Sequence, residues 1–296
     1  MNDYLHVHEK FRHVMQWSDQ ERIAFIKQPR WVDYDMAKRI LDGLEELLNE
    51  PVKERIANVL IVGRSNLGKT TLVKRFFEKY GEPWIDDDTG AVKPIVFVQA
   101  PPGGKEKDLY LEILDRFYAP FRATESSAAL RAQVVHLLRE HRVRMLIVDE
   151  LQHLLSGQTV RQRNAIDSLK FLCNEVSVSI VGVGTQEAVN VLHADDQHTS
   201  RFFKQELKPW SLDVGFQRFL ANYQRVLPLK QPSEIAQPEL ASLIHSLSDG
   251  MTGEALRLVA SSAKHAITSG KELIDRETIE KNARPVGSDG FREFVT

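Results

Sequence analysis

The most informative segment of the chain is Val59-Leu-Ile-Val62-Gly63-Arg-Ser-Asn-Leu-Gly68-Lys69-Thr70. Residues 63–70 match the pattern G-x-x-x-x-G-K-[ST], directly after an apolar run and directly before a helical pattern. A glycine-rich loop in this setting directs backbone N–H groups and a helix N-terminus at a phosphate group. The sequence therefore predicts a phosphate-binding loop, or P-loop, between a buried strand and a helix.

The side chains of this loop predict ATP and Mg²⁺ as cofactors. Lys69 is expected to contact the β- and γ-phosphates, and the Thr70 hydroxyl is expected to bind Mg²⁺. The predicted nucleotide contacts of this segment are Gly63, Arg64, Ser65, Asn66, Leu67, Gly68, Lys69, Thr70 and Thr71.

Short apolar runs continue on both sides of amphipathic helical segments. Such runs occupy residues 59–62, 95–98, 145–148 and 178–183, and a fifth strand is expected near 203–207. Runs this apolar are typical of parallel strands that are buried on both faces. Helical patterns over 69–80, 107–118, 127–141 and 161–175 alternate with them. The chain is therefore expected to be an α/β protein with a parallel sheet flanked by helices.

Two acidic residues end the third apolar run. Asp149 is expected to hold Mg²⁺, and Glu150 is expected to orient the attacking water. An acidic pair at a strand end is common on protein surfaces, but about 80 residues after a P-loop it predicts hydrolysis of the nucleotide.

Three polar residues further along complete the predicted catalytic set. Thr185 follows the fourth apolar run, where it would sense the γ-phosphate or cap the helix that begins at Gln186, and both roles are compatible. Arg201 and Arg257 are expected to stabilise charge on the transferred phosphoryl group, with Arg257 also binding the nucleotide.

The regions on either side of this core are predicted to be helical. Residues 1–56 are expected to form an N-terminal helical segment, 57–212 the α/β core, 213–284 a helical lid and 285–296 a C-terminal tail. Ser18 and Glu21 form a capping box in the first segment. Trp31 and Tyr34 are equally compatible with packing near the adenine or anchoring the N-terminal helices.

Composition limits the remaining classes of protein. The 296 residues are 42% hydrophobic and 27% charged, which is typical of a globular protein. The net charge of −2 confines any nucleic-acid contact to a local patch. Cys173 is the one cysteine, and the sequence has neither a leader-like start nor a run of ~18 apolar residues. We therefore expect a cytoplasmic protein without a membrane span.

These features together resemble those of AAA+ ATPases, and more narrowly of the TniB/TnsC family of transposition regulators. The P-loop and the acidic pair are shared by many ATPases. The narrower resemblance depends on Asp149-Glu-Leu-Gln-His-Leu-Leu-Ser-Gly157 and Leu169-Lys-Phe-Leu-Cys-Asn174. It extends from Arg30-Trp-Val-Asp-Tyr34 through Ser200-Arg-Phe202 to Leu227-Pro-Leu229.

The resemblance implies an AAA+ fold and an ATP-dependent protein that assembles head to tail on double-stranded DNA, as a ring or a helical filament. Such a protein marks a target and recruits or activates a DDE transposase, often with a TniQ-like adaptor, and hydrolysis dissolves the assembly. The site would lie between subunits, with Arg201 supplied by the neighbour. The family pattern implies DNA contacts at Lys105 and Thr124, with Lys107 as a weaker candidate.

Two other functions are compatible with the motifs. A P-loop kinase of a small acceptor would also use a helical lid and acidic residues, but it would leave Thr185 and Arg201 unexplained. A STAND-like ATPase signalling switch usually carries a long sensor or effector domain, and none fits after residue 215.

Overall fold

The chain divides into two compact units. The computed structural model describes residues 4–51, 56–88, 90–122, 124–155, 159–193 and 202–284. One unit, here called the α/β unit, comprises Met36–Lys208. The other, the helical unit, combines Met1–Asp35 with Pro209–Thr296.

A five-stranded parallel sheet forms the centre of the α/β unit. Its strand order is β4-β5-β6-β1-β7, and every adjacent pair is parallel. Three strands are buried along their whole length, as the uninterrupted apolar runs predicted. The strands are β1 (Asn58–Val62), β4 (Ile95–Gln99), β5 (Met145–Asp149), β6 (Ser179–Gly184) and β7 (Phe202–Glu206). The four predicted strands and the fifth near residues 203–207 are thus confirmed.

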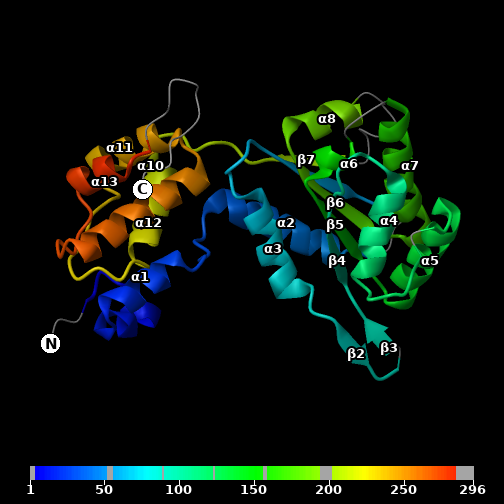
Figure 1. Ribbon diagram of the computed structural model, residues 1–296, viewed down its shortest axis with the longest axis horizontal. Coiled ribbons are helices and arrows are strands. Elements are labelled where there is room, and N and C mark those ends of the chain that lie inside the picture. Colours follow the sequence, from blue (N-terminus) through cyan, green and yellow to red (C-terminus); the bar gives the residue numbers. More distant parts are fainter. Residues whose placement is uncertain are drawn as a thin grey trace. The chain divides into compact units, whose positions relative to one another are not determined.

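Helices cover both faces of this sheet (Figure 1). Alternate strand residues such as Val62 and Val148 share one continuous core with α4, α5 and α7. On the other face, Phe77 of α3 packs against Phe97 of β4. The helices of this unit are α2 (Asp35–Asn49), α3 (Lys69–Tyr80), α4 (Glu106–Asp115), α5 (Ser127–Glu140), α6 (Leu151–Leu154), α7 (Thr159–Val176) and α8 (Gln186–His193).

A small hairpin, which the sequence analysis did not predict, extends from the α/β unit (Figure 1). Its antiparallel strands are β2 (Trp84–Asp86) and β3 (Gly90–Val92). Each strand has three residues, which is too short for an alternating pattern to stand out. Ile85 is 82% exposed, so the hairpin contributes little to the core.

The helical unit is formed from both ends of the chain. Its core contains Ile26 of the N-terminal region and Phe216, Leu258 and Ile279 of the C-terminal helices. Its elements are the 3₁₀ helix η1 (Glu9–Gln16), α1 (Asp19–Lys27), α10 (Val214–Gln224), α11 (Pro238–Ser248), α12 (Thr252–Thr268) and α13 (Arg276–Asn282). The capping box predicted at Ser18 and Glu21 is present at the start of α1.

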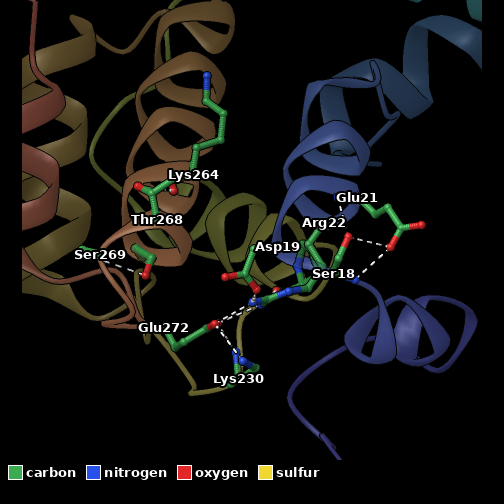
Figure 2. A network of polar contacts seen from close by, with 11 residues as sticks. Ser18, Asp19, Glu21, Arg22, Lys230, Lys264, Thr268, Ser269 and Glu272 are labelled. Carbon is green, nitrogen blue, oxygen red and sulfur yellow. Dashed lines mark hydrogen bonds and ion pairs between the residues drawn. The ribbon is translucent and has the colours of Figure 1, made fainter.

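A buried charge network joins the two ends of the chain (Figure 2). The Arg22 side chain is 0% exposed and donates to both carboxylate oxygens of Glu272, at 2.8 and 2.6 Å. It also donates to Asp19 Oδ1 at 2.7 Å and to the Pro228 carbonyl at 2.8 Å. A buried guanidinium needs such partners because its desolvation is otherwise costly.

This network explains why the compact units differ from the expected segments. The sequence pattern predicts that residues 1–56 form a segment separate from 213–284. In the structure, residues 1–35 belong with the C-terminal helices, and α2 continues into the α/β unit. Tyr34 packs against Trp210 and Phe219, which favours the anchoring role over packing near adenine. The tail 285–296 lies outside the described residues.

Among the residues that the structure describes, no helix combines the length and the apolar character that a membrane span requires.

Candidate functional site

The P-loop connects β1 to α3 with two residues in left-handed backbone conformations. Asn66 has φ 62° and Gly68 has φ 85°, and Gly68 occupies the N-cap position of α3 without a side-chain cap. The N–H groups of the first helical turn have no partner within the helix and favour an anion. Gly63 allows a close approach, since a Cβ there would lie 2.6 Å from the Leu207 carbonyl oxygen. The loop therefore has the geometry of a phosphate cradle.

Lys69 lies across this loop. Its Nζ donates to the carbonyl oxygens of Gly63 at 2.8 Å and Arg64 at 2.9 Å. Partial burial lowers its pKa, and the charges of Glu150 and Asp149 oppose that shift. The ammonium group is thus held at the loop, where a bound anion would offset the free-energy cost of burying its charge.

Thr70 and Asp149 lie close together although they are 79 positions apart in the sequence. The Thr70 hydroxyl lowers the pKa of the Asp149 carboxyl. Asp149, at the end of β5, is 5% exposed, and burial has the larger effect and raises its pKa. A hydroxyl beside a buried carboxylate is an oxygen donor set that suits Mg²⁺. These two residues therefore fit the metal that the P-loop implies.

Glu150 follows in a left-handed conformation with φ 54°. Its backbone N–H donates to Asp149 Oδ1 at 2.9 Å. Its side-chain Oε2 accepts a hydrogen bond from Gln152 Nε2. No role was predicted for Gln152, although it belongs to the run from Asp149 to Gly157 that carries the family resemblance and lies two residues after Glu150.

Thr185 comes directly after β6 and directly before α8. Its hydroxyl donates to Glu187 Oε2 at 3.3 Å, and its backbone N–H donates to Gln152 Oε1 at 3.3 Å. The residue thus occupies the helix-start position that the sequence predicted, and its role as a γ-phosphate sensor stays a prediction.

The sheet register brings these residues to one edge. Val62 pairs with Gly184, and Val148 pairs with Gly182, so β1, β5 and β6 end side by side. The P-loop, the acidic pair and Thr185 each follow one of these carboxyl ends, where ligands bind in open α/β sheets. The α/β unit therefore combines a phosphate cradle, a metal donor pair and a carboxylate.

The structure does not place the two predicted arginines relative to this cluster. Arg201 lies outside the described residues. Arg257 is in α12 of the helical unit, where its Nε donates to Glu254 Oε2 at 2.9 Å. Its contact with the nucleotide stays a prediction.

The candidate DNA contacts lie before and after α4. Lys105 is exposed at the N-cap position of α4, and Lys107 is half-buried in its first turn. Thr124 is exposed after the end of this helix.

Solved structures show which fold this arrangement belongs to. Cdc6p from Pyrobaculum aerophilum has a TM-score of 0.60 at 18% identity, covering 88% of this chain and 69% of that one. ORC1 from Aeropyrum pernix in complex with DNA has a TM-score of 0.60 at 16% identity, covering 88% and 68%. The RuvB Holliday junction branch migration motor of Thermotoga maritima has a TM-score of 0.53 at 16% identity, covering 91% and 76%. The fold is therefore that of AAA+ ATPases.

Comparison of the sequence itself identifies one family. No curated protein matches this chain significantly. The sequence profile described as "Bacterial TniB protein" matches residues 22–212, which is more than half of the chain. The chain therefore belongs to the TniB family and has the fold of AAA+ ATPases.

Proposed function

We propose that this protein is an ATP-dependent, DNA-binding regulator of DNA transposition. The observation that carries the proposal is the TniB family match over a chain whose P-loop, Thr70–Asp149 pair and Glu150 meet at one sheet edge. The protein assembles on duplex DNA with ATP, marks the target site and recruits or activates a DDE transposase with a TniQ-like adaptor. Hydrolysis then dissolves the assembly.

Each residue of the proposed nucleotide site has a role in binding or hydrolysing ATP. Bound ATP and Mg²⁺ supply the terminal phosphoryl group and the charge that balances it. The P-loop N–H groups and Lys69 bind the phosphate oxygens, while Thr70 and Asp149 hold the metal. Glu150 orients the attacking water, and Thr185 responds to the γ-phosphate from the end of β6.

Assembly depends on residues from two protomers. Arg257 acts within one protomer, and Arg201 acts on the nucleotide of its neighbour. Because the site is complete only when a neighbour supplies Arg201, binding of ATP favours a head-to-tail ring or helical filament. The protein works without a membrane, in the cytoplasm.

The DNA contacts lie on the α/β unit. Lys105 and Lys107 contact backbone phosphates, and Thr124 adds a hydrogen bond to the same backbone. These contacts read no bases, which suits a protein that coats DNA of any sequence. The net charge of −2 makes these local contacts necessary. The likeness in fold to a solved ORC1–DNA complex supports this proposal.

Sedimentation and negative-stain imaging with duplex DNA test the function. The protein is compared with ATP, a non-hydrolysable analogue or ADP, each with Mg²⁺, beside Lys69→Ala and Arg201→Ala. Lys74→Ala is the matched control, because Lys74 is an exposed lysine of the same helix. We expect rings or filaments on DNA with ATP and with the analogue, lost in both variants and retained in the control.

The opposite result has a clear meaning. A protein that stays monomeric and ignores DNA in every nucleotide state is not a transposition regulator of this kind. Consumption of ATP only with a small acceptor would then indicate the kinase. Assembly with a protein partner in place of DNA would indicate the signalling switch.

A further inference from the structure

One side chain connects the carboxyl ends of β5 and β6. Gln152 lies in α6, and its Nε2 donates to Glu150 Oε2. Its Oε1 accepts from the backbone N–H of Thr185 at 3.3 Å. Both ends of one carboxamide are thus used, one by the hydrolytic carboxylate and the other by the residue after β6.

The surrounding backbone holds Gln152 in this position. Glu150 turns the chain through a left-handed conformation, which brings α6 back toward β6. Leu151 is fully buried there, in the space that the missing side chain of Gly182 provides. Gly184 provides the room for Gln152 itself, since a Cβ at 184 would lie 2.8 Å from Gln152 Oε1. The carboxamide therefore has little freedom to move.

The bond from Gln152 restricts Glu150 in a specific way. It uses Oε2 of the carboxylate and leaves Oε1 to accept a hydrogen bond from water. A carboxylate on a short flexible side chain would otherwise rotate, and a misplacement of about 1 Å lowers turnover roughly 100-fold. A fixed carboxylate is thus already aligned when the water arrives.

We propose that Gln152 is the positioning residue for Glu150 and ties its orientation to the Thr185 backbone at the end of β6. This proposal rests on the proposed ATPase function. Because Gln152 is bonded to both groups, a displacement of the Thr185 backbone also displaces the Glu150 carboxylate.

Two substitutions separate the two bonds of Gln152. Gln152→Met keeps the length of the side chain and removes both hydrogen bonds. Gln152→Glu keeps an oxygen for the Thr185 N–H but offers Glu150 no donor at neutral pH. Gln133→Met is the matched control, since Gln133 donates to the Pro120 carbonyl at 3.0 Å from α5 of the same unit.

The measurements are ATP turnover, affinity for a fluorescent ATP analogue with Mg²⁺, and amide exchange at Thr185 in the protein without nucleotide. Both Gln152 variants should lose about 10- to 100-fold in kcat while the affinity changes less than about threefold. Exchange at Thr185 should rise in Gln152→Met and stay near that of the unsubstituted protein in Gln152→Glu. Gln133→Met should leave all three measurements unchanged.

A variant that fails to fold is recognised by its melting temperature, and Gly184→Ala then replaces it. Its added Cβ displaces the Gln152 carboxamide without altering an acidic residue, so the same loss of kcat is expected. The proposal is overturned if turnover in folded Gln152→Met is within twofold of the unsubstituted protein or higher. It is also overturned if affinity falls as much as turnover. An unsubstituted protein that hydrolyses no ATP would instead overturn the proposed function, and this proposal with it.

Discussion

A buried ion pair of the helical unit and the charged residues of the candidate site in the α/β unit are stabilised in opposite ways. In the helical unit, the hydrogen bond from Arg22 to Glu272 raises the pKa of the guanidinium. Burial opposes ionisation of Glu272, but its bonds to Arg22 and Lys230 hold its pKa below the ordinary value. In the α/β unit, burial lowers the pKa of Lys69 and raises that of Asp149. The Arg22–Glu272 pair is stabilised within the protein, whereas Lys69 and Asp149 are left to be stabilised by a charged ligand.

The difference shows where stability and function are located. A group whose charged form is disfavoured in the protein gains most from an added opposite charge, which is the condition for binding phosphate and metal. A group that is already paired gains nothing from a ligand but holds distant segments together. In the helical unit, the ion pair of Arg22 and Glu272 holds together two segments that are distant in the sequence. In the α/β unit, Lys69 and Asp149 are suited to bind a nucleotide and its metal ion.

The largest expected effect comes from removing the buried arginine. Arg22→Ala leaves Glu272 buried, 8% exposed, without its main partner. We expect a loss of about 3–5 kcal/mol in the free energy of unfolding. Urea unfolding followed by tryptophan fluorescence measures it well, because Trp17, Trp31 and Trp210 all lie in the helical unit.

Arg218→Ala is the control for this prediction. Arg218 also pairs with an acidic residue of the helical unit, Asp35, at 3.5 Å, but both side chains are exposed. Its loss should cost less than about 1 kcal/mol. Equal losses in the two variants would contradict the idea that burial of the ion pair holds the unit together.

The second-largest expected effect comes from a substitution that disturbs the packing of the P-loop. Gly63→Ala places a Cβ 2.6 Å from the Leu207 carbonyl and 3.1 Å from Leu67, so the loop must shift. We expect a loss of about 1–3 kcal/mol and weaker binding of ATP. Hydrogen exchange by mass spectrometry should locate the loss in peptides of the α/β unit.

The matched control, Gly43→Ala, is expected to raise the free energy of unfolding instead of lowering it. Gly43 lies inside α2, and a Cβ there would meet nothing within 4 Å. Gly43→Ala should therefore stabilise the protein by about 0.5–1 kcal/mol, because alanine is the better helix former. Destabilisation by Gly43→Ala would show that the steric reasoning fails for this unit.

The sequence was sufficient to predict the α/β unit and the helices after residue 213, but insufficient to predict that both ends of the chain form one unit. The P-loop, the acidic pair and the strands that carry them are encoded locally, in consecutive residues whose order alone specifies strand, loop and helix. The partner of Arg22 is 250 residues away, and nothing around position 22 specifies position 272. The expected boundary after residue 56 therefore followed the change in pattern, while the compact units follow long-range contacts.

In the candidate site, the residues of local motifs were predicted, and the residue that depends on strand pairing was not. Lys69, Thr70, Asp149 and Glu150 belong to recognisable motifs, and the structure brings them together. Gln152 was missed because its position between Glu150 and Thr185 exists only after β5 and β6 pair. Its carboxamide also needs the space at Gly184, where a Cβ would lie 2.8 Å from Gln152 Oε1.

Acid should weaken the helical unit through Glu272. Its folded pKa lies below the ordinary value of 4.5, so the stabilisation is present above about pH 4.5 and is lost as the pH falls through the folded value. We expect a smaller loss than in Arg22→Ala, since the protonated carboxyl still accepts a hydrogen bond. Urea midpoints between pH 7 and pH 3 measure it.

Glu272→Gln provides the comparison for the acid experiment. The variant should be less stable than the unsubstituted protein at pH 7, and the difference should shrink below about pH 4.5. A difference that stays constant down to pH 3 would show that the charge of Glu272 contributes nothing.

The smallest effect concerns two helix N-termini. The α1 helix is capped by its own side chains, since the Ser18 hydroxyl accepts from the Glu21 N–H and the Glu21 carboxylate accepts from the Ser18 N–H. The α3 helix begins after Gly68, which has no side chain to serve as a cap. Ser18→Ala should therefore cost about 1 kcal/mol in the free energy of unfolding, measured in urea, while Ser18→Thr should restore most of it. Inorganic phosphate should slow hydrogen exchange at the start of α3 and leave α1 unchanged, because α3 begins without a side-chain cap, whereas the first turn of α1 carries the carboxylates of Asp19 and Glu21, which repel an anion. Equal protection of both helices by phosphate would remove the distinction between a helix start that is capped by its own side chains and one that is left for a ligand.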